Sequence, residues 1–306
     1  MPTNIAFLCL AHTNFDYLEE VSNYYNSGND KLFLHIDTKS NSSILKNLHP
    51  DTVLIPEKDS FRTRWGTMEI VYATLKLLQM AYAQNKYQRF ILISGADIPL
   101  LTKFELKEKL AKDQSYLSIW SEASLTKQTS VNGEFFKKHF YYSKYTNLGE
   151  AYASKCRIRI YLALILNKLI SLIPVKDSFT FDKYYKGSQW WCLTDELTNY
   201  LLSELKHPKI FQQFNQMHAP DEKVIHSILM NSPYANKIEV TQGQATLRQA
   251  LHYIDWGYSA ETISIQEFSI EKLNTAKALG CTFARKIAPN NIGSYVSHVQ
   301  SLTNRQ

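Results

Sequence analysis

Residues 5–12, IAFLCLAH, form an unbroken apolar run that ends at His12. A run of this length and composition is typical of a strand buried on both faces, as in a parallel sheet. Residues 31–36, KLFLHI, form a second run that stops at Asp37, and apolar residues between the two runs recur near helical spacing. This β-α-β order predicts two parallel strands joined by a right-handed crossover.

Strands and helices continue to alternate over the first part of the chain. Residues 52–55 (TVLI) and 89–93 (RFILI) are further apolar runs, and apolar residues in steps of three and four predict a long amphipathic helix after Gly66. Such alternation is typical of an α/β domain with a mostly parallel sheet. We therefore expect the first ~120 residues to form a unit of the nucleotide-binding type.

Polar side chains follow several of these runs directly. Ligands of α/β sheets bind beyond the carboxyl ends of the strands, and His12, His35 and Asp37 lie there. Asp97 lies at the same edge, in the Gly- and Pro-containing loop after residues 89–93. Asp37 could accept hydrogen bonds from a ribose or a base, or it could cap the turn that follows it.

Residues 187–194, GSQWWCLT, place two tryptophans behind a Gly-Ser pair. Adjacent tryptophans are costly in a solvated loop, so they predict a short strand whose rings either wall a pocket or fill the core. Thr194 is placed to cap the helix that follows. Asp221 is predicted to cap a later helix, which would put Glu222 in the first turn as an ordinary dipole partner or as a functional carboxylate.

The composition bounds the classes of protein that remain. The chain has 306 residues, 44% hydrophobic and 20% charged, which describes a globular protein. Its net charge of +6 includes no dense Lys/Arg run, so we expect no nucleic-acid partner. Neither Asp-x-Asp nor a Gly-rich phosphate loop occurs, so a bound diphosphate would need cationic side chains. Four cysteines without C-x-x-C spacing, and no signal peptide, predict a reducing compartment.

Residues 158–173, IRIYLALILNKLISLI, are the most apolar stretch. A bilayer span needs about 20 residues, so this stretch is too short to cross a membrane. A buried helix is the first interpretation. The alternative is an interfacial helix that rests on a membrane, helped by flanking basic residues. These are Lys155, Arg157, Arg159 and Lys168.

Two further pairs of residues stand near the end of the chain. Trp256 and Tyr258 alternate, so on an extended chain both rings would face one side and form a platform for a sugar. Arg285 and Lys286 follow a short apolar run. Adjacent basic residues there are either a solvated strand end or the cations that a diphosphate would require.

Seven motifs, in this order and spacing, resemble one family. They are HIDTKS at 35–40, WG at 65–66, SGADIPL at 94–100, GSQWW at 187–191, PDE at 220–222, YIDW at 253–256 and FARK at 283–286. Over nearly the whole chain they look like the core-2/I-branching β-1,6-N-acetylglucosaminyltransferase and peptide O-xylosyltransferase family, glycosyltransferase family 14. The resemblance implies a GT-A-like fold, a Rossmann-type mixed α/β sheet flanked by helices in a single large domain. Residues 1–120 would form the nucleotide-sugar-binding half, and residues 121–306 the acceptor-binding and catalytic half.

The resemblance also implies roles for individual residues. Glu222 corresponds to the catalytic base, Arg285 and Lys286 to the cations that hold the donor diphosphate, and Asp37 to a uridine contact. The other donor-binding candidates are His12, His35 and Asp97. The acceptor-binding candidates are Gln189, Trp190, Trp191, Trp256 and Tyr258.

An inverting enzyme that uses a UDP-sugar without a metal or other cofactor is what the resemblance implies. Gln189 stands where the xylosyltransferases carry an acidic residue. This favours a sugar hydroxyl as acceptor over a peptide serine. N-acetylglucosamine as the sugar transferred is what the resemblance to the branching enzymes implies. The expected partners are a UDP-sugar and an oligosaccharide or glycolipid, with a peripheral membrane contact as an alternative.

Two features usual in Golgi members of the family are missing, a membrane anchor and paired cysteines. Their absence suggests a bacterial, cytoplasmic enzyme at the inner face of the membrane that builds surface polysaccharide or lipooligosaccharide. A xylosyl- or other hexosyltransferase of the same family is the second hypothesis. A non-catalytic nucleotide- or glycan-binding module is the alternative of another class.

Overall fold

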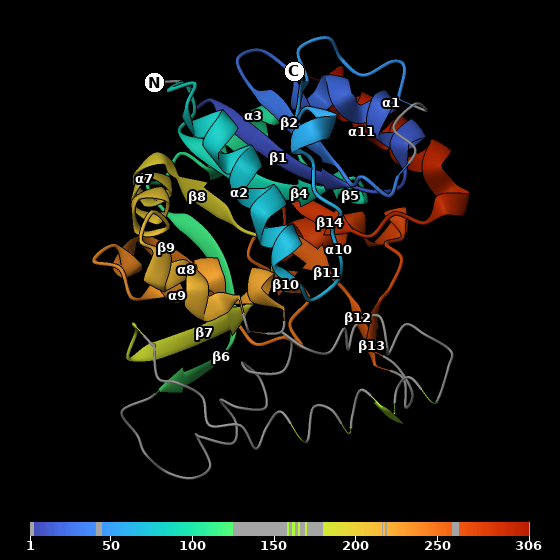
Figure 1. Cartoon of the computed structure of the whole chain (residues 1–306). Helices are drawn as coiled ribbons and strands as arrows, with labels where there is room; N and C mark the ends of the chain where they lie inside the picture. Colours follow the sequence, from blue (N-terminus) through green and yellow to red (C-terminus); the bar gives the residue numbers. More distant parts are fainter. Residues whose placement is uncertain are drawn as a thin grey trace.

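The computed structural model describes residues 3–40, 45–124, 180–215, 217, 219–258 and 263–305, together with positions 158, 161, 162, 165 and 169. A mixed sheet runs through the molecule, and helices cover both of its faces (Figure 1). The fold is therefore a mixed α/β single domain, consistent with the GT-A-like fold predicted above.

The predicted parallel strands form one half of the large sheet. β1 (Ile5–Ala11) lies between β2 (Lys31–Ile36) and β4 (Arg89–Ser94), and the short β3 (Val53–Leu54) pairs with β2. All of these pairs are parallel. Nearly every residue of β1 and β4 is buried, as their unbroken apolar sequences require.

The other half of the large sheet is mostly antiparallel. β8 (Cys192–Thr194) pairs with β4, and β6 (Ser115–Ser124) continues the sheet to β7 (Lys183–Gly187), while β9 (Ile238–Gln242) runs parallel to β6. The prediction that the two tryptophans form a strand is wrong. β7 ends at Gly187 and β8 begins at Cys192, so the tryptophans lie in the connection between them.

A smaller sheet joins distant parts of the chain. Its order is β10 (Arg248–Gln249), β11 (His252–Ile254), β14 (Phe283–Arg285) and β5 (Asp97–Pro99). β12 (Trp256–Tyr258) and β13 (Ile263–Ile265) form a separate hairpin. β14 is antiparallel to β5, which sets Arg285 opposite Asp97.

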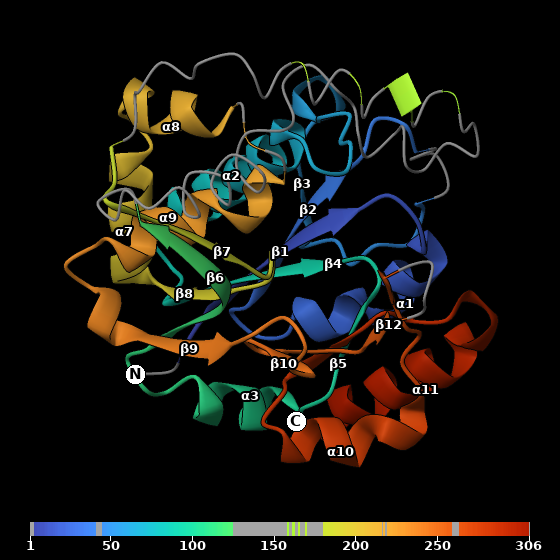
Figure 2. The same ribbon diagram turned by 90° about the horizontal axis from the view of Figure 1, so that it is seen from below.

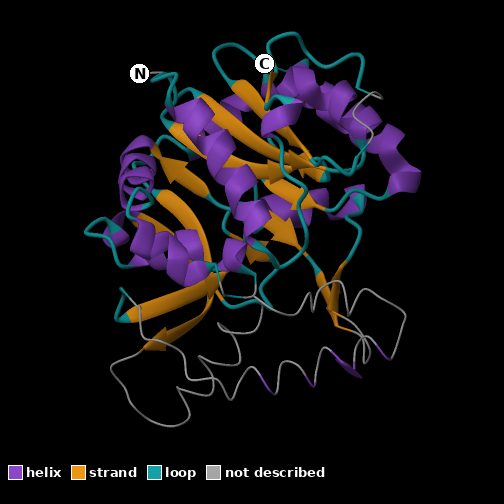
Figure 3. Cartoon of the chain, in the orientation of Figure 1, coloured by secondary structure: helices purple, strands orange, loops and turns teal. Residues whose placement is uncertain are grey.

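The helices lie in two groups, one on each face (Figures 1 and 2). The first comprises α1 (Phe15–Tyr25), α3 (Lys103–Lys109), α10 (Leu273–Ala278) and α11 (Ile292–Thr303). The second comprises α2 (Met68–Tyr82), α7 (Asp195–Glu204), α8 (Pro208–Phe214) and α9 (Val224–Met230). Side chains of β1 alternate between the two cores, with Phe7 in the first and Leu8 in the second. The sheet is thus buried on both faces (Figure 3).

Helix caps follow the sequence only in part. The Thr194 side chain accepts a hydrogen bond from the Leu197 N–H, as predicted. Asp221 does not cap a helix, because residues Pro220–Glu222 form a separate 3₁₀ turn and α9 begins after Lys223. The turn follows Ala219, whose φ of 48° reverses the chain before the proline. A 3₁₀ turn over Ile270–Lys272 likewise precedes α10, which begins at Leu273.

The described positions of the apolar stretch 158–173 are helical, and all five side chains there are exposed. The expectation of a buried helix is therefore wrong for these side chains. In the part of the chain that is described, no helix has the length and apolar character that crossing a membrane requires.

Candidate active site

A buried ion pair lies where β14 meets β5. Arg285 Nη1 donates hydrogen bonds to Asp97 Oδ1 at 2.9 Å and to Ser94 Oγ at 3.0 Å. Burial by itself raises the pKa of the Asp97 carboxyl, but the charge of Arg285, the nearby His252 ring and hydrogen bonds from Ser94 hold that pKa below its ordinary value. Asp97 is 0% exposed, so it positions Arg285 and does not reach a donor itself. This corrects the direct donor contact expected for Asp97.

The two adjacent tryptophans have different environments. The Arg285 guanidinium lies over the Trp190 ring, with its Cζ 4.2 Å from the ring centroid. The ring of His252 packs next to Trp190. A guanidinium over an indole face is a cation–π contact, which orients the arginine. Trp191 is 1% exposed and belongs to the core cluster of α2, α7 and α9. A ring buried to that extent packs and cannot stack on an acceptor sugar, which corrects the expectation for Trp191.

Asp37 holds the loop after β3. Its Oδ2 accepts the Thr63 N–H at 2.9 Å and the Thr63 hydroxyl, and its Oδ1 accepts the Lys39 N–H at 2.8 Å. Although burial raises its pKa, these hydrogen bonds and the charge of Lys39 lower the pKa of Asp37 below its ordinary value. Asp37 thus caps the turn after β2, which was one of the two predicted roles.

A cavity of about 230 Å³ lies beside Asp37. Its walls are partly apolar, from Ile36, Leu54, Ile55 and Pro56, and partly polar, from Asp37, Thr38, Ser40, Glu57 and Ser60. Apolar walls with a few polar groups are typical of a pocket for a flat ring such as a base. The uridine contact of Asp37 stays a prediction.

His12 follows β1 directly and lies within electrostatic reach of both the Asp37 turn and Arg285. Loss of hydration at its ring lowers the pKa of His12, although the residue is exposed as a whole. Asp37 raises that pKa, while Lys39 and Arg285 lower it further, so all three charges lie within electrostatic reach of one ring. The fold therefore brings the donor-side candidates from β1, β2 and β14 to one edge of the sheet.

His35 acts through its neighbours. It is buried, and its Nε2 accepts the Phe61 N–H at 3.0 Å, so it holds the same loop as Asp37. Burial lowers its pKa and keeps the ring neutral. A buried ring of this kind supports the loop, which corrects the expectation of a direct donor contact for His35.

The Glu222 carboxylate is paired with a cation. Glu222 Oε2 lies 3.2 Å from the Lys186 ammonium, and both side chains are partly exposed. Lys186 Nζ also lies 5.4 Å from the Trp120 ring centroid, and Trp120 packs edge-on against Trp256 at 6.0 Å. Glu222 is thus linked to a predicted acceptor residue through Lys186 and Trp120.

Asp221 is the neighbour of Glu222, and its carboxyl is buried. Burial and the negative charge of Glu222 raise the pKa of Asp221 to about 7, against the opposing charges of Lys223 and Lys186. Its Oδ1 has no hydrogen-bond partner among the described residues. Leaving a buried carboxylate oxygen unpaired favours the protonated form.

We expect the wild-type protein to lose stability as pH rises from about 4 to 8, because Asp221 must ionise while buried. The Asp221→Asn variant should not show this loss. The folded pKa of about 7 is above the ordinary 3.8, so the stability that Asp221 contributes is full below pH 3.8 and is lost as pH rises through 7. Relative to wild type, the variant should gain about 1–4 kcal/mol between pH 4 and pH 8, at ~1.4 kcal/mol per pKa unit. Urea unfolding over this range measures it. Asp113→Asn, at an exposed aspartate, is the control, and equal pH slopes for all three proteins would refute the expectation.

The segment 189–191 connects the two halves of the site. Gln189 and Trp191 line a cavity of about 10 Å³ together with Asp221, while Trp190 between them contacts Arg285. Successive side chains therefore point to the Glu222 turn and to the Arg285 pair. Gly187 permits this path, because a Cβ there would stand 1.7 Å from the Ser118 carbonyl oxygen.

Three predicted site residues remain to be described, Lys286, Trp256 and Tyr258. Lys286 is exposed, and its ammonium makes no ion pair with any described residue. Trp256 is partly buried, and its indole N–H has no acceptor among the described residues. Tyr258 pairs through its backbone with Ile263, and its side chain lies outside the described residues. These acceptor roles stay predictions.

Sequence reasoning missed several residues that build the site. Lys186, Trp120, His252 and Thr63 each contact a predicted residue through tertiary packing. Lys186 and His252 directly precede the motifs GSQWW and YIDW, whereas no quoted motif lies beside Trp120. Within the described ranges, His, Cys, Asp and Glu side chains do not gather in threes as a metal site would require.

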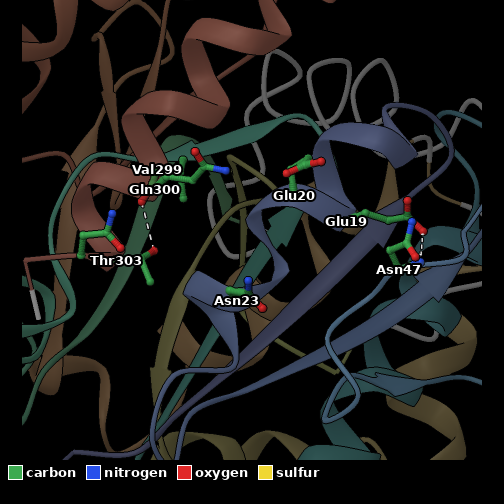
Figure 4. Close-up of a pocket in the computed structure, with 8 residues that line it drawn as sticks. Glu19, Glu20, Asn23, Asn47, Val299, Gln300 and Thr303 are labelled. Carbon is green, nitrogen blue, oxygen red and sulfur yellow. Dashed lines mark hydrogen bonds between the residues drawn. The ribbon is translucent and has the colours of Figure 1, made fainter.

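A separate cavity of about 420 Å³ lies between α1 and α11 (Figure 4). Its lining is polar and partly acidic, from Glu19, Glu20, Asn23, Asn47, Val299, Gln300, Thr303 and Asn304. Glu19 Oε1 already accepts the Asn47 N–H at 2.6 Å. None of the predicted site residues lines this cavity, so we do not assign it to the reaction.

The family model for core-2/I-branching enzymes matches residues 5–277, which include six of the seven motifs quoted above. No curated protein sequence matches the chain. Because the matched region covers most of the 306 residues, the chain belongs to the core-2/I-branching enzyme family and is a glycosyltransferase of that type.

Proposed function

We propose that this glycosyltransferase moves N-acetylglucosamine from a UDP-sugar to a hydroxyl group of an oligosaccharide or glycolipid acceptor. The reaction would proceed with inversion and without a metal, and the pathway would be synthesis of a bacterial surface polysaccharide or lipooligosaccharide in the cytoplasm. The observation that carries the proposal is the segment 189–191. Gln189 and Trp191 line a small cavity with Asp221, the neighbour of Glu222, and Trp190 between them lies under the Arg285 guanidinium.

Glu222 is the proposed general base. Its carboxylate would take the proton of the acceptor hydroxyl as that oxygen attacks C1 of the donor sugar from the face opposite the diphosphate. Lys186, 3.2 Å away, holds the carboxylate in place and is a positioning residue. Trp256 and Tyr258 would orient the acceptor, which lowers the entropic cost of the displacement.

The proposed donor site uses the charges at the edge of the sheet. Asp37 and its cavity of about 230 Å³ would receive the uridine. The charge of Arg285 is already balanced by Asp97, so Lys286 is the cation of the pair left to neutralise the leaving diphosphate. Cationic groups that are fixed before the reaction stabilise developing charge without reorganisation.

A UDP-release assay with four donors tests the function. UDP-N-acetylglucosamine should be turned over, and UDP-xylose, UDP-glucose and UDP-galactose should be poorer donors. A ligand at 100 times its Kd should add about 2.7 kcal/mol to stability, which thermal unfolding measures. We expect 5 mM EDTA to change neither result, because cationic side chains neutralise the diphosphate.

Different results would contradict the proposed catalysis, the proposed donor sugar and the proposed independence of metal. Stabilisation by UDP with no turnover of any donor would identify a binding module. Better turnover of UDP-xylose would change the sugar and leave the mechanism in place. Strict dependence on Mn²⁺ would refute the metal-free site.

A further inference from the structure

Gln249 is a buried amide on β10 whose hydrogen bonds join two parts of the chain. Its side chain is 0% exposed. Its Oε1 accepts hydrogen bonds from the Trp120 indole N–H at 2.7 Å and from the Ser118 hydroxyl, both on β6. Its Nε2 donates to backbone carbonyl oxygens in the segment 243–246, at 2.8–3.2 Å. Both ends of the amide are therefore engaged, and the segment 243–246 is tied to β6.

The partners of Gln249 fix which way its side chain lies. An indole N–H only donates and a backbone carbonyl only accepts, so the amide oxygen must face Trp120 and the amide nitrogen the segment 243–246. A carboxylate here would turn an oxygen toward those carbonyls, and an apolar side chain would leave the Trp120 N–H without this acceptor. Gln249 is thus matched to Trp120 in its chemistry as well as in its position.

The ring of Trp120 extends this contact toward Glu222. The Lys186 ammonium lies 5.4 Å from the Trp120 ring centroid and 3.2 Å from Glu222 Oε2. An aromatic face attracts a cation, so the ring and the carboxylate together restrict where the ammonium lies. Trp120 also packs edge-on against Trp256, with ring centroids 6.0 Å apart. A shift of the Trp120 ring would therefore move the surroundings of both Lys186 and Trp256.

Gln249 stands directly opposite His252 in the pairing of β10 with β11. Side chains at opposite positions lie on the same face of a sheet. His252 is 0% exposed, and its Nε2 lies 3.5 Å from Asp97 Oδ2. One short hairpin therefore supports Trp120 through Gln249 and the buried carboxylate of Asp97 through His252.

We propose that Gln249 is a positioning residue for the glycosyl transfer and acts on Glu222 through Trp120 and Lys186. This inference rests on the proposed role of Glu222 as the base. Gln249 is fully buried, so it works by fixing the aromatic face against which Lys186 lies, and Lys186 in turn fixes the carboxylate. Precise placement matters because a shift of about 1 Å in a reacting group can cost about 10²-fold in rate.

Gln249→Met tests the proposal, because methionine is close to glutamine in size but lacks the amide. We expect kcat to fall about tenfold, because the base is less well placed, and the affinity for UDP to change less than about twofold. UDP affinity should hold because the donor-side candidates lie on β1, β2 and β14. Steady-state release of UDP measures kcat, and isothermal titration measures the affinity.

The same substitution in a Lys186→Met background separates positioning from a general loss of packing. There Gln249→Met should lower kcat by less than a further factor of about two, because the link through which it acts is already removed. Trp120→Phe keeps a ring but loses the N–H, so it should also lower kcat in the wild type and not in the Lys186→Met background. This variant decides the question if Gln249→Met does not fold.

Asn26→Leu is the matched control. Asn26 is 5% exposed, its Nδ2 donates to the Ser22 carbonyl oxygen and to the Thr52 hydroxyl, and its Oδ1 accepts the Leu32 N–H. It follows α1, in the helix group on the opposite face of the sheet from α9. Its replacement should reduce the free energy of unfolding, as Gln249→Met does, but leave kcat within about twofold of wild type.

The outcomes distinguish failure of this inference from failure of the proposed base. Equal losses of kcat for Gln249→Met with and without Lys186 would overturn the inference alone, and so would equal losses for Gln249→Met and Asn26→Leu. Turnover by Glu222→Gln at the wild-type rate would overturn the proposed base and this inference together.

Discussion

Glu222→Gln is expected to lower kcat by about 10²-fold or more, the usual worth of a positioned general base. The amide is close to the carboxylate in size but cannot take a proton from the acceptor hydroxyl. Binding of UDP should not change, because the donor-side candidates lie on β1, β2 and β14, while Glu222 lies in the 3₁₀ turn before α9. The measurement is a steady-state assay of UDP release, with UDP affinity determined separately.

Two further variants make this experiment specific. Glu196→Gln alters a partly exposed carboxylate on α7 that pairs with Lys237, and it should leave kcat within about twofold of wild type. Lys186→Met removes the cation that holds Glu222, so it should lower kcat less than Glu222→Gln does. Turnover of the Glu222→Gln variant at the wild-type rate would exclude Glu222 as the base.

Arg285→Met is expected to reduce the free energy of unfolding by about 3–5 kcal/mol at pH 7. The substitution keeps an apolar stem over Trp190 but leaves the Asp97 carboxylate, which is 0% exposed, without its cation. Ser94 still donates two hydrogen bonds to Asp97, but these do not replace the charge. Urea unfolding measures the loss.

The dependence of this loss on pH identifies its cause. In the wild type the pKa of Asp97 is lowered, so the stability that the pair contributes is present above the ordinary pKa of 3.8 and is lost as pH falls through the folded pKa. Without Arg285, burial raises that pKa. The deficit of the variant should therefore shrink as pH falls from 7 toward 5, where Asp97 can take up a proton.

Two controls separate the ion pair from general packing. Asp97→Asn combined with Arg285→Met should recover most of the lost stability, because no uncompensated charge remains. Arg64→Met breaks a partly exposed pair with Glu69 and should cost about 1 kcal/mol or less. An Arg285→Met protein that loses less than this control would contradict the assigned role.

Three strands of the large sheet could be predicted from the local sequence alone. The strands β1, β2 and β4 follow from unbroken apolar runs, because only a strand covered on both faces buries such a sequence. The cap at Thr194 followed from the acidic first turn after it. The Asp221 cap failed, because the reversal at Ala219 and Pro220 made a 3₁₀ turn that local propensity did not reveal.

The site residues were identified as a set, and the sequence left their partners open. The motif GSQWW marked Trp190 and Trp191 equally, yet Trp190 contacts Arg285 and Trp191 fills the core. The connection between β7 and β8 runs beside β4, where the Leu92 N–H donates a hydrogen bond to the Trp191 carbonyl oxygen. No pattern within the motif contains that contact.

By itself, the sequence determined the α/β class, the positions of the parallel strands along the chain and those of the polar residues at their ends, because these depend on apolar runs and chain reversals. Only the tertiary structure decided that Asp97 and Arg285, 188 residues apart, form a buried pair, and that Lys186 holds Glu222. The physical reason is that strand pairing and side-chain packing set these distances, and neither is encoded in the spacing of neighbouring residues.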